Sequence, residues 1–228
     1  MDGKGVTFYE THWTETVGYM EWHLLALRER GVEINSLIDI GAAHGDFSLM
    51  FKDLFGDVDV TAIEANPLDK HYLDRTNWNV IYKALGKENG KQVFYTNPDD
   101  PVGGGSSLYR ENTAWFDNAK ETEMDVVTLD SLNLKGDFVK IDVQGAELDI
   151  LQGGKETLKD TKFLLLELSF LDYNVGAPLI DEVLRETYDQ GFRMLDTFGP
   201  VKGGHIFNDK KNQVDVLLAK KDLPVFVV

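Results

Sequence analysis

Three acidic side chains occur in or directly after short apolar segments, and their positions suit the binding of a molecule that carries hydroxyl groups. Asp39 lies inside the first of these segments, Glu64 follows the second, and Asp142 lies near the end of a third. A carboxylate accepts hydrogen bonds from hydroxyl groups and can also take a proton from one. If the three segments are parallel strands, their carboxyl ends meet at one edge of a sheet, where a ligand is expected.

Two glycines separated by three residues follow Asp39 in the sequence D-I-G-A-A-H-G. Gly41 and Gly45 allow the backbone to turn sharply and let a ligand approach it closely. Dinucleotide-binding turns have the pattern G-x-G-x-x-G because a pyrophosphate must contact bare backbone, whereas Ala42 and His44 stand inside this turn. The turn therefore favours a cofactor without a phosphate, such as S-adenosylmethionine. A tight strand–helix turn that binds nothing is the alternative.

Glu64 lies 23 residues after Gly41, near the spacing at which an acid binds ribose hydroxyls in nucleotide-binding folds. Both ribose hydroxyls can donate hydrogen bonds to a carboxylate, whereas a phosphate on the ribose would be repelled by it. Asn66 and Pro67 end this strand and begin the next helix. We therefore expect Glu64 to bind the ribose of the cofactor, with a solvated carboxylate at a strand end as the alternative.

The apolar segments and helical periodicities predict an α/β fold: a Rossmann-like, open, mostly parallel seven-stranded sheet with helices on both faces and an antiparallel last strand. The expected strands are at residues 37–40, 58–63, 79–85, 138–143, 163–168, 194–196 and 214–219, with a short extra strand at 92–95. The expected helices are at residues 14–30, 46–51, 68–75, 147–151 and 179–188. We expect residues 1–34 to form an N-terminal helical segment and residues 35–228 to form a single domain.

The composition limits the classes of partner. The net charge of the 228-residue chain is −16, which argues against nucleic acids and anionic membrane surfaces as partners. Cysteine is absent, which excludes disulfides, thiolate metal sites and a cysteine nucleophile. No secretory signal or membrane-spanning run is present, so we expect a cytoplasmic location. The oligomeric state is left open.

Residues 97–112 form the longest irregular stretch, with the sequence G-G-G-S-S at residues 103–107. Loops of this length inside a compact domain are usually functional or disordered. We expect a mobile flap over the active site; an ordinary surface loop is the alternative.

Four segments in this order carry a resemblance to a known family: D-I-G-A-A-H-G (39–45), I-E-A-N-P (63–67), T-L-D-S-L (128–132) and K-I-D-V-Q-G-A-E (140–147). The set resembles the FkbM-type methyltransferases, a branch of the class I S-adenosylmethionine-dependent enzymes. The resemblance covers residues 37–168 well and the C-terminal part loosely. The family commonly has glutamate at the position of Gln144, so this chain lacks one acid that the family pattern offers.

The resemblance implies transfer of the cofactor's methyl group to an acceptor oxygen, on a sugar or a small natural product. A neutral hydroxyl is a weak nucleophile, so a nearby base should take its proton. Asp142 is the first candidate for this catalytic base, and His44 is the second because histidine titrates near neutrality. A divalent metal is not favoured, because the spacing of the acids does not require one. The expected cofactor-binding residues are Asp39, Gly41, Ala42, Gly45, Glu64, Ala65, Asn66, Ala84, Leu85 and Asp142.

Two other classes of function are left open by the sequence. A Rossmann oxidoreductase with a nucleotide cofactor would use the same edge of the sheet, although the missing third glycine counts against it. A non-catalytic partner protein that binds S-adenosylmethionine would need no base, and Asp142 argues against this class.

The ribose role of Glu64 can be measured directly. Glu64→Ala should weaken the binding of S-adenosylhomocysteine by about 1–3 kcal/mol, the scale for losing charge-assisted hydrogen bonds. Isothermal calorimetry that gives an unchanged affinity would reject the ribose role.

Overall fold

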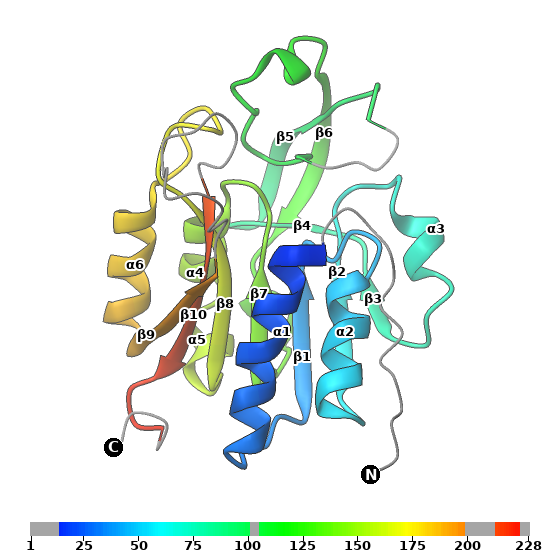
Figure 1. Ribbon diagram of the computed structural model, residues 1–228. Helices are drawn as coiled ribbons and strands as arrows, with labels where there is room; N and C mark the ends of the chain where they lie inside the picture. The colour runs from blue at the N-terminus through cyan, green and yellow to red at the C-terminus, as the bar shows by residue number, and fades with distance from the viewer. Residues whose placement is uncertain (1–13, 101–104, 199–212, 224–228) are drawn as a thin grey trace.

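A seven-stranded sheet forms the centre of the protein in the computed structural model, which describes residues 14–100, 105–198 and 213–223 (Figure 1). The strand order is β3-β2-β1-β7-β8-β10-β9. Strand β10 is antiparallel to both of its neighbours, and the other pairs are parallel. The predicted mostly parallel sheet with an antiparallel last strand is therefore confirmed. Its strands are β1 (Ser36–Ile40), β2 (Asp59–Ile63), β3 (Asn79–Ile81), β7 (Phe138–Ile141), β8 (Phe163–Ser169), β9 (Phe192–Phe198) and β10 (Gln213–Lys220).

Helices cover both faces of this sheet, with α1 and α2 in front and α4 and α5 behind it (Figure 1). The helix α3 is shorter than the predicted 68–75, because the backbone forms tighter three-residue turns on either side of it. The N–H of Asp69 donates to Asn66 and that of Arg75 donates to Tyr72, both at 3.2 Å. No helix among the described residues combines the length and apolar character needed to cross a bilayer. The helices are α1 (Thr14–Glu29), α2 (Asp46–Phe55), α3 (Lys70–Leu73), α4 (Glu147–Gly153), α5 (Lys155–Lys159) and α6 (Ile180–Asp189), and short 3-10 turns occur at η1 (Ala114–Phe116) and η2 (Asp130–Leu132).

The core consists of two layers because side chains alternate between the two faces of each strand. Ile38 and Val139 face the layer that contains α4, α5 and α6. Leu37 faces the opposite layer, which contains α2 and also Leu24 of α1. Helix α1 thus shares an apolar core with the sheet, whereas the proposed division of the chain at residue 34 stays a prediction.

A second, three-stranded sheet was only partly predicted. It has the order β4-β6-β5 and consists of β4 (Ala84–Leu85), β5 (Gly90–Thr96) and β6 (Lys120–Val127). The expected single strand at 79–85 is divided, because β3 pairs with β2 while β4 pairs with β6. Most residues of β6 are charged or exposed, so this strand lacks the alternating apolar pattern on which the sequence interpretation relied.

The register of the central strands brings the predicted acids to one edge. Asp39 of β1 lies opposite Lys140 of β7, and also opposite Ala62 of β2. The three strands therefore end at the same level, with Gly41 and Asp142 following β1 and β7. The backbone N–H of Asp142 donates to Ile40 at 3.0 Å, which continues the strand pairing to the edge.

Gly41 is required by the close approach of two chain segments. Its φ is +76°, and a Cβ atom placed on it would lie 1.8 Å from the backbone oxygen of Asp142. Gly41→Ala should lower the free energy of unfolding by about 2–4 kcal/mol, from the left-handed backbone and the overpacking together. Gly31 is the matched control, because its φ is +77° and no atom lies within 4 Å of the corresponding Cβ position.

Gly31→Ala should therefore cost only the backbone contribution of about 1–2 kcal/mol. Urea denaturation of both variants measures the difference. Equal losses would show that the contact with Asp142 relaxes at no cost.

Candidate functional site

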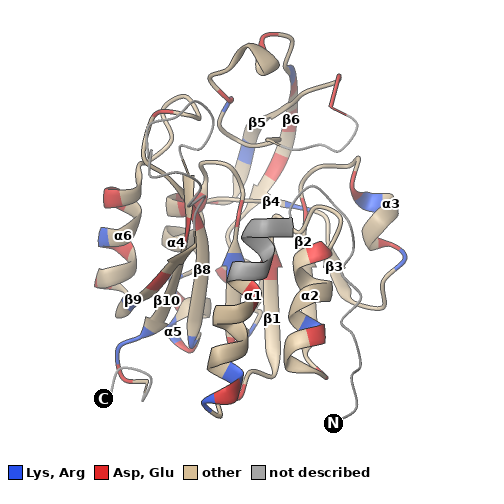
Figure 2. Cartoon of the chain, in the orientation of Figure 1, with Lys and Arg blue, Asp and Glu red and all other residues tan. Residues whose placement is uncertain are grey.

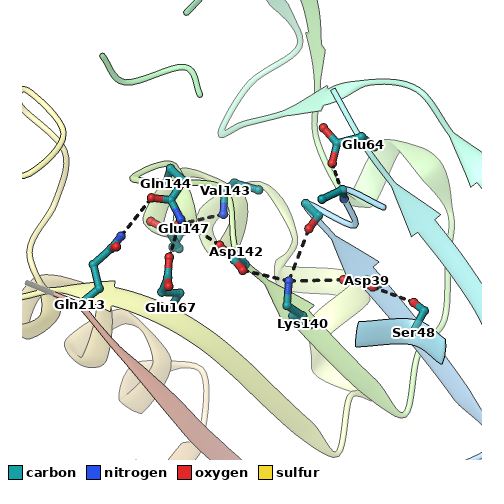
Figure 3. A network of polar contacts seen from close by, with 12 residues as sticks. Asp39, Ser48, Glu64, Lys140, Asp142, Val143, Gln144, Glu147, Glu167 and Gln213 are labelled. Atoms are coloured by element: carbon teal, nitrogen blue, oxygen red, sulfur yellow. Dashed lines mark hydrogen bonds and ion pairs between the residues drawn. The ribbon is translucent and has the colours of Figure 1, made fainter. Parts of the chain in front are cut away.

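A chain of polar contacts crosses the C-terminal edge of the sheet from β1 to β10 (Figure 3). It begins at Asp39, which is fully buried and accepts a hydrogen bond from the Ser48 hydroxyl of α2 at 2.7 Å. Burial raises the pKa of Asp39, while Lys140 and Ser48 act in the opposite direction. Because Asp39 is enclosed by protein, its contacts favour a supporting role beneath the predicted cofactor site.

Lys140 connects Asp39 with Asp142. Its Nζ lies 3.6 Å from Oδ1 of Asp39 and 3.1 Å from Oδ2 of Asp142, and it donates to the Gly41 carbonyl at 3.4 Å. Burial opposes the charged lysine, but the two carboxylates outweigh burial and leave its pKa raised. The sequence interpretation missed Lys140, although a lysine in an otherwise apolar strand was a signal.

Asp142 is the predicted acid that solvent reaches, since 32% of its side chain is exposed. Partial burial would raise its pKa, but Lys140 and hydrogen bonds from Gln144 and Glu167 lower it. Asp142 is therefore ionised at neutral pH and can accept a hydrogen bond or a proton.

Glu64 joins the glycine turn to the segment after β2. Its carboxylate accepts the backbone N–H groups of Ala43 at 2.8 Å and Asn66 at 2.7 Å. Burial raises its pKa to about 7 even though these hydrogen bonds act in the opposite direction. Each carboxylate oxygen has a second lone pair, so the contact with ribose hydroxyls stays a prediction that this geometry allows.

His44, the second candidate base, contacts the segment that leads into α3. Its Nε2 lies 3.2 Å from Oδ1 of Asp69, and its ring centroid lies 3.9 Å from that of Tyr72. These contacts attach α3 to the glycine turn, whereas Asp142 belongs to the Lys140 network. The structure therefore does not bring the two candidate bases together.

The other predicted cofactor residues occupy different environments. A Cβ placed on Gly45 would lie 2.7 Å from the Trp78 ring, so protein fills the space that we had expected a ligand to approach. Ala42, Ala84 and Leu85 are buried, which leaves mainly their backbone for a cofactor contact. Ala65 is half-buried. Asn66 is buried, and its side-chain oxygen accepts the Leu68 N–H at 3.1 Å.

Ser107 fixes one end of the predicted flap. Its hydroxyl lies 2.8 Å from the carbonyl oxygens of both Val143 and Gln144, and its backbone pairs with Tyr95 of β5 at 2.8 and 3.1 Å. Residues 103 and 104 of the glycine run lie outside the described residues. Ser107 is thus anchored to the turn after β7, contrary to the expectation that it belongs to a mobile segment.

Three residues that were not among the predicted site residues form a network with Asp142. Gln144 and Glu167 contact it directly, and Gln213 is joined to it through Gln144. Gln144 donates from Nε2 to Oδ1 of Asp142 at 3.1 Å and contacts Oε2 of Glu167. Its Oε1 accepts a hydrogen bond from Gln213 of β10 at 3.2 Å. Burial and the nearby Asp142 raise the pKa of Glu167 well above its ordinary range. A glutamate inside the apolar run 163–168 was the signal that could have indicated this position.

Asp142, Glu147 and Glu167 are the acids that could in principle hold a divalent metal. Asp142 and Glu167 share contacts with Gln144, whereas Glu147 binds backbone N–H groups of the turn before α4. Glu147 accepts the N–H groups of Gly145 at 3.0 Å and Val143 at 3.2 Å, so it stabilises the start of α4. Burial raises its pKa to about 7. Across the described parts of the chain, no three histidine, aspartate or glutamate side chains are grouped so that they could hold a metal ion.

Comparisons with known proteins identify the fold and the sequence pattern. The family model described as the methyltransferase FkbM domain matches residues 39–194, about two thirds of the chain. None of the curated proteins compared matches the sequence.

Two solved methyltransferase structures resemble the protein. Precorrin-6y C5,15-methyltransferase from Geobacter metallireducens GS-15 is 17% identical with a TM-score of 0.51, and the alignment covers 95% of this chain and 98% of that one. The N-methyltransferase NodS from Bradyrhizobium japonicum WM9 is 10% identical with a TM-score of 0.50, covering 91% and 97%. At these identities the likeness concerns the fold.

Lys140 offers a test of the network. Lys140→Met would leave Asp39 and Asp142 without their shared counter-charge, and breaking a buried ion pair costs about 3–5 kcal/mol. The pKa values of both acids should then rise in the folded state only, so stability is lost as the pH rises above their unfolded pKa. Urea denaturation should therefore show a larger deficit at pH 8 than at pH 5.

The exposed pair of Lys91 and Glu123, 2.8 Å apart, provides the control, and Lys91→Met should change stability little at either pH. A deficit of Lys140→Met that does not depend on pH would mean that lost packing, and not lost charge, explains it.

Proposed function

The chain belongs to the FkbM methyltransferase family, and we propose that it methylates a hydroxyl oxygen of a sugar or a small natural product. S-adenosylmethionine is the cofactor, and when bound it supplies a methyl group on a positively charged sulfonium. The observation that supports an oxygen acceptor is Asp142, an ionised and partly exposed carboxylate beside the glycine turn. Family membership also decides against the oxidoreductase alternative.

The residues at the edge of the sheet have the chemistry that this cofactor requires. Glu64 has free lone pairs for the ribose hydroxyls, and the backbone of the turn from Gly41 to Gly45 lies next to it. The turn offers no glycine-rich cradle for a phosphate, and the cofactor has none. The partly exposed carboxylate of Asp142, only part of whose charge Lys140 neutralises, gives this edge a negative character, which suits the positive charge of the sulfonium.

Asp142 then acts on the acceptor. Its carboxylate orients the acceptor hydroxyl and takes the hydroxyl proton as the oxygen attacks the methyl carbon. Lys140 keeps Asp142 ionised at neutral pH, so the proton acceptor is ready without a prior deprotonation step. His44, held by Asp69, is the second candidate for this role.

A small acceptor fits the charge of the protein better than a nucleic acid does. The chain has 39 acidic and 23 basic residues, and acidic positions occur at both ends of the sheet (Figure 2). Such a surface repels the phosphate backbone of RNA or DNA. A protein that binds S-adenosylmethionine without catalysis is the remaining alternative, and binding without turnover over a broad acceptor panel would favour it.

Asp142→Asn separates catalysis from binding. The variant keeps the size of the side chain but cannot take a proton, and its single amide oxygen can accept from only one of the two donors, Lys140 and Gln144. Transfer of labelled methyl groups to a panel of sugars and phenols should fall by roughly 10²–10⁴, also at saturating acceptor. The affinity for S-adenosylhomocysteine should stay within a few-fold of the wild type. Raising the pH should partly restore the methylation of phenols, which ionise unaided, and hardly that of sugars.

Asp125→Asn, at an exposed position beside Lys83, is the control and should not change the rate. Near-normal turnover by Asp142→Asn would transfer the base role to His44 or to water. Loss of S-adenosylhomocysteine binding would assign Asp142 to cofactor binding instead.

A further inference from the structure

Gln144 adopts a backbone conformation that is unfavourable for its residue type. Its φ is +58°, and the next residue, Gly145, has a φ of +114°. A left-handed conformation costs a residue with a Cβ roughly 1–2 kcal/mol. The Ser107 hydroxyl, 2.8 Å from the Gln144 carbonyl, and the Glu147 carboxylate, 3.0 Å from the Gly145 nitrogen, hold the turn in place. Backbone strain that the surroundings maintain in this way is typical of functional positions.

The side chain of Gln144 is fixed at both of its polar atoms (Figure 3). Nε2 donates to Oδ1 of Asp142 at 3.1 Å and also contacts Oε2 of Glu167. Oε1 accepts a hydrogen bond from Nε2 of Gln213 at 3.2 Å. The opposite orientation of the amide would place its oxygen against the ionised carboxylate of Asp142, so this contact determines which atom is the donor.

One amide group therefore holds two carboxyl groups together. Two carboxylates that contact the same amide nitrogen lie close enough to repel each other. This repulsion favours the state in which the pair keeps one proton. Lys140 contacts Asp142 at 3.1 Å on the oxygen that Gln144 does not use, so the negative charge is favoured on Asp142. Burial and the charge of Asp142 raise the pKa of Glu167, in agreement with this assignment. The other ionisable groups that act on the pair are Asp39, Glu147, Tyr173 and Asp215.

We propose that Gln144 is a positioning residue for the proton acceptor: it holds Asp142 and Glu167 as a pair of carboxyl groups that carries one proton, on Glu167. This inference rests on the proposed function and deepens it, because it explains how Asp142 stays ionised beside a second acid. As the acceptor oxygen forms its bond to the methyl carbon, the electrons of the carbon–sulfur bond remain on sulfur. The hydroxyl proton moves to Asp142, the pair then holds two protons, and one is released to solvent.

The ionisation of both acids can be followed without turnover. Carboxyl carbons of the full chain labelled with ¹³C at aspartate and glutamate are titrated by NMR in the presence of S-adenosylhomocysteine. Asp142→Asn and Glu167→Gln assign the two signals. Asp142 should ionise below the ordinary carboxyl range and Glu167 above it, and the signal of each should also respond to the ionisation of the other.

Two variants of Gln144 test its part in this arrangement. Gln144→Met removes the amide donors, and Gln144→Glu keeps the size but adds a third carboxyl group. Both changes should raise the pH at which Asp142 ionises by about one unit, and by more in Gln144→Glu. Where an acceptor is methylated, the acidic limb of the pH–rate profile should move upward by the same amount. The control is Gln152→Met on α4. It removes a 3.5 Å contact with Glu186 that is not part of the network around Asp142, so both titrations should stay unchanged.

The proposal is overturned if Asp142 and Glu167 of the wild type ionise independently in the ordinary range, or if the folded Gln144 variants leave the ionisation of Asp142 unchanged. If Gln144→Met does not fold, the titration of Asp142 in Gln144→Glu tests the proposal alone. The titrations also separate this proposal from the proposed function. A coupled pair in a protein that methylates no hydroxyl contradicts only the function, whereas hydroxyl methylation with independent titrations contradicts only the role of Gln144.

Discussion

The contact of the Lys140 ammonium with Asp39 and Asp142 is the interaction on which the edge of the sheet depends. A buried charge is tolerated only when partners compensate its desolvation, and the parallel pairing of β1 and β7 places Lys140 directly opposite Asp39. The same ammonium reaches the Gly41 carbonyl, so one side chain connects two strands, the glycine turn and the proposed base. The electrostatics of the site are thus a consequence of strand register.

Sequence periodicity predicted the elements that have a strong local signal. The apolar strands and the helix that follows Gly45 are where the spacing placed them, because their side chains alternate or recur with the period of one element. Strand β6 (Lys120–Val127) was missed since most of its residues are charged or exposed. Ala84 and Leu85 were joined to the preceding strand, although they pair with β6, a contact that local sequence does not encode.

The sequence predicted where the candidate site lies, but not the hydrogen bonds and ion pairs that join its residues. The motif around Gly41 and the strand ends indicated the edge of the sheet, and Glu64 and Asp142 lie there. The contact of Gln144 with Gln213 joins residues 69 positions apart, and only the strand order β7-β8-β10 brings them together. The two glycines were interpreted as space for a ligand, whereas Asp142 and Trp78 occupy that space. The two fold neighbours are at most 17% identical to this chain, so they share its scaffold. The choice of acceptor depends on side-chain contacts of the site, which a shared fold does not determine.

The position of β10 has a consequence for how the protein is made. This strand is inserted between β8 and β9 although it follows both in the chain, so β9 has no partner in the sheet until residues 213–220 have left the ribosome. Until then the apolar edge of β8 is open to other chains, which is the kind of exposure that chaperones cover during vectorial synthesis. Gln213, which holds Gln144, arrives with the same strand. Closure of the sheet and completion of the polar network are therefore one late event in the life of each molecule.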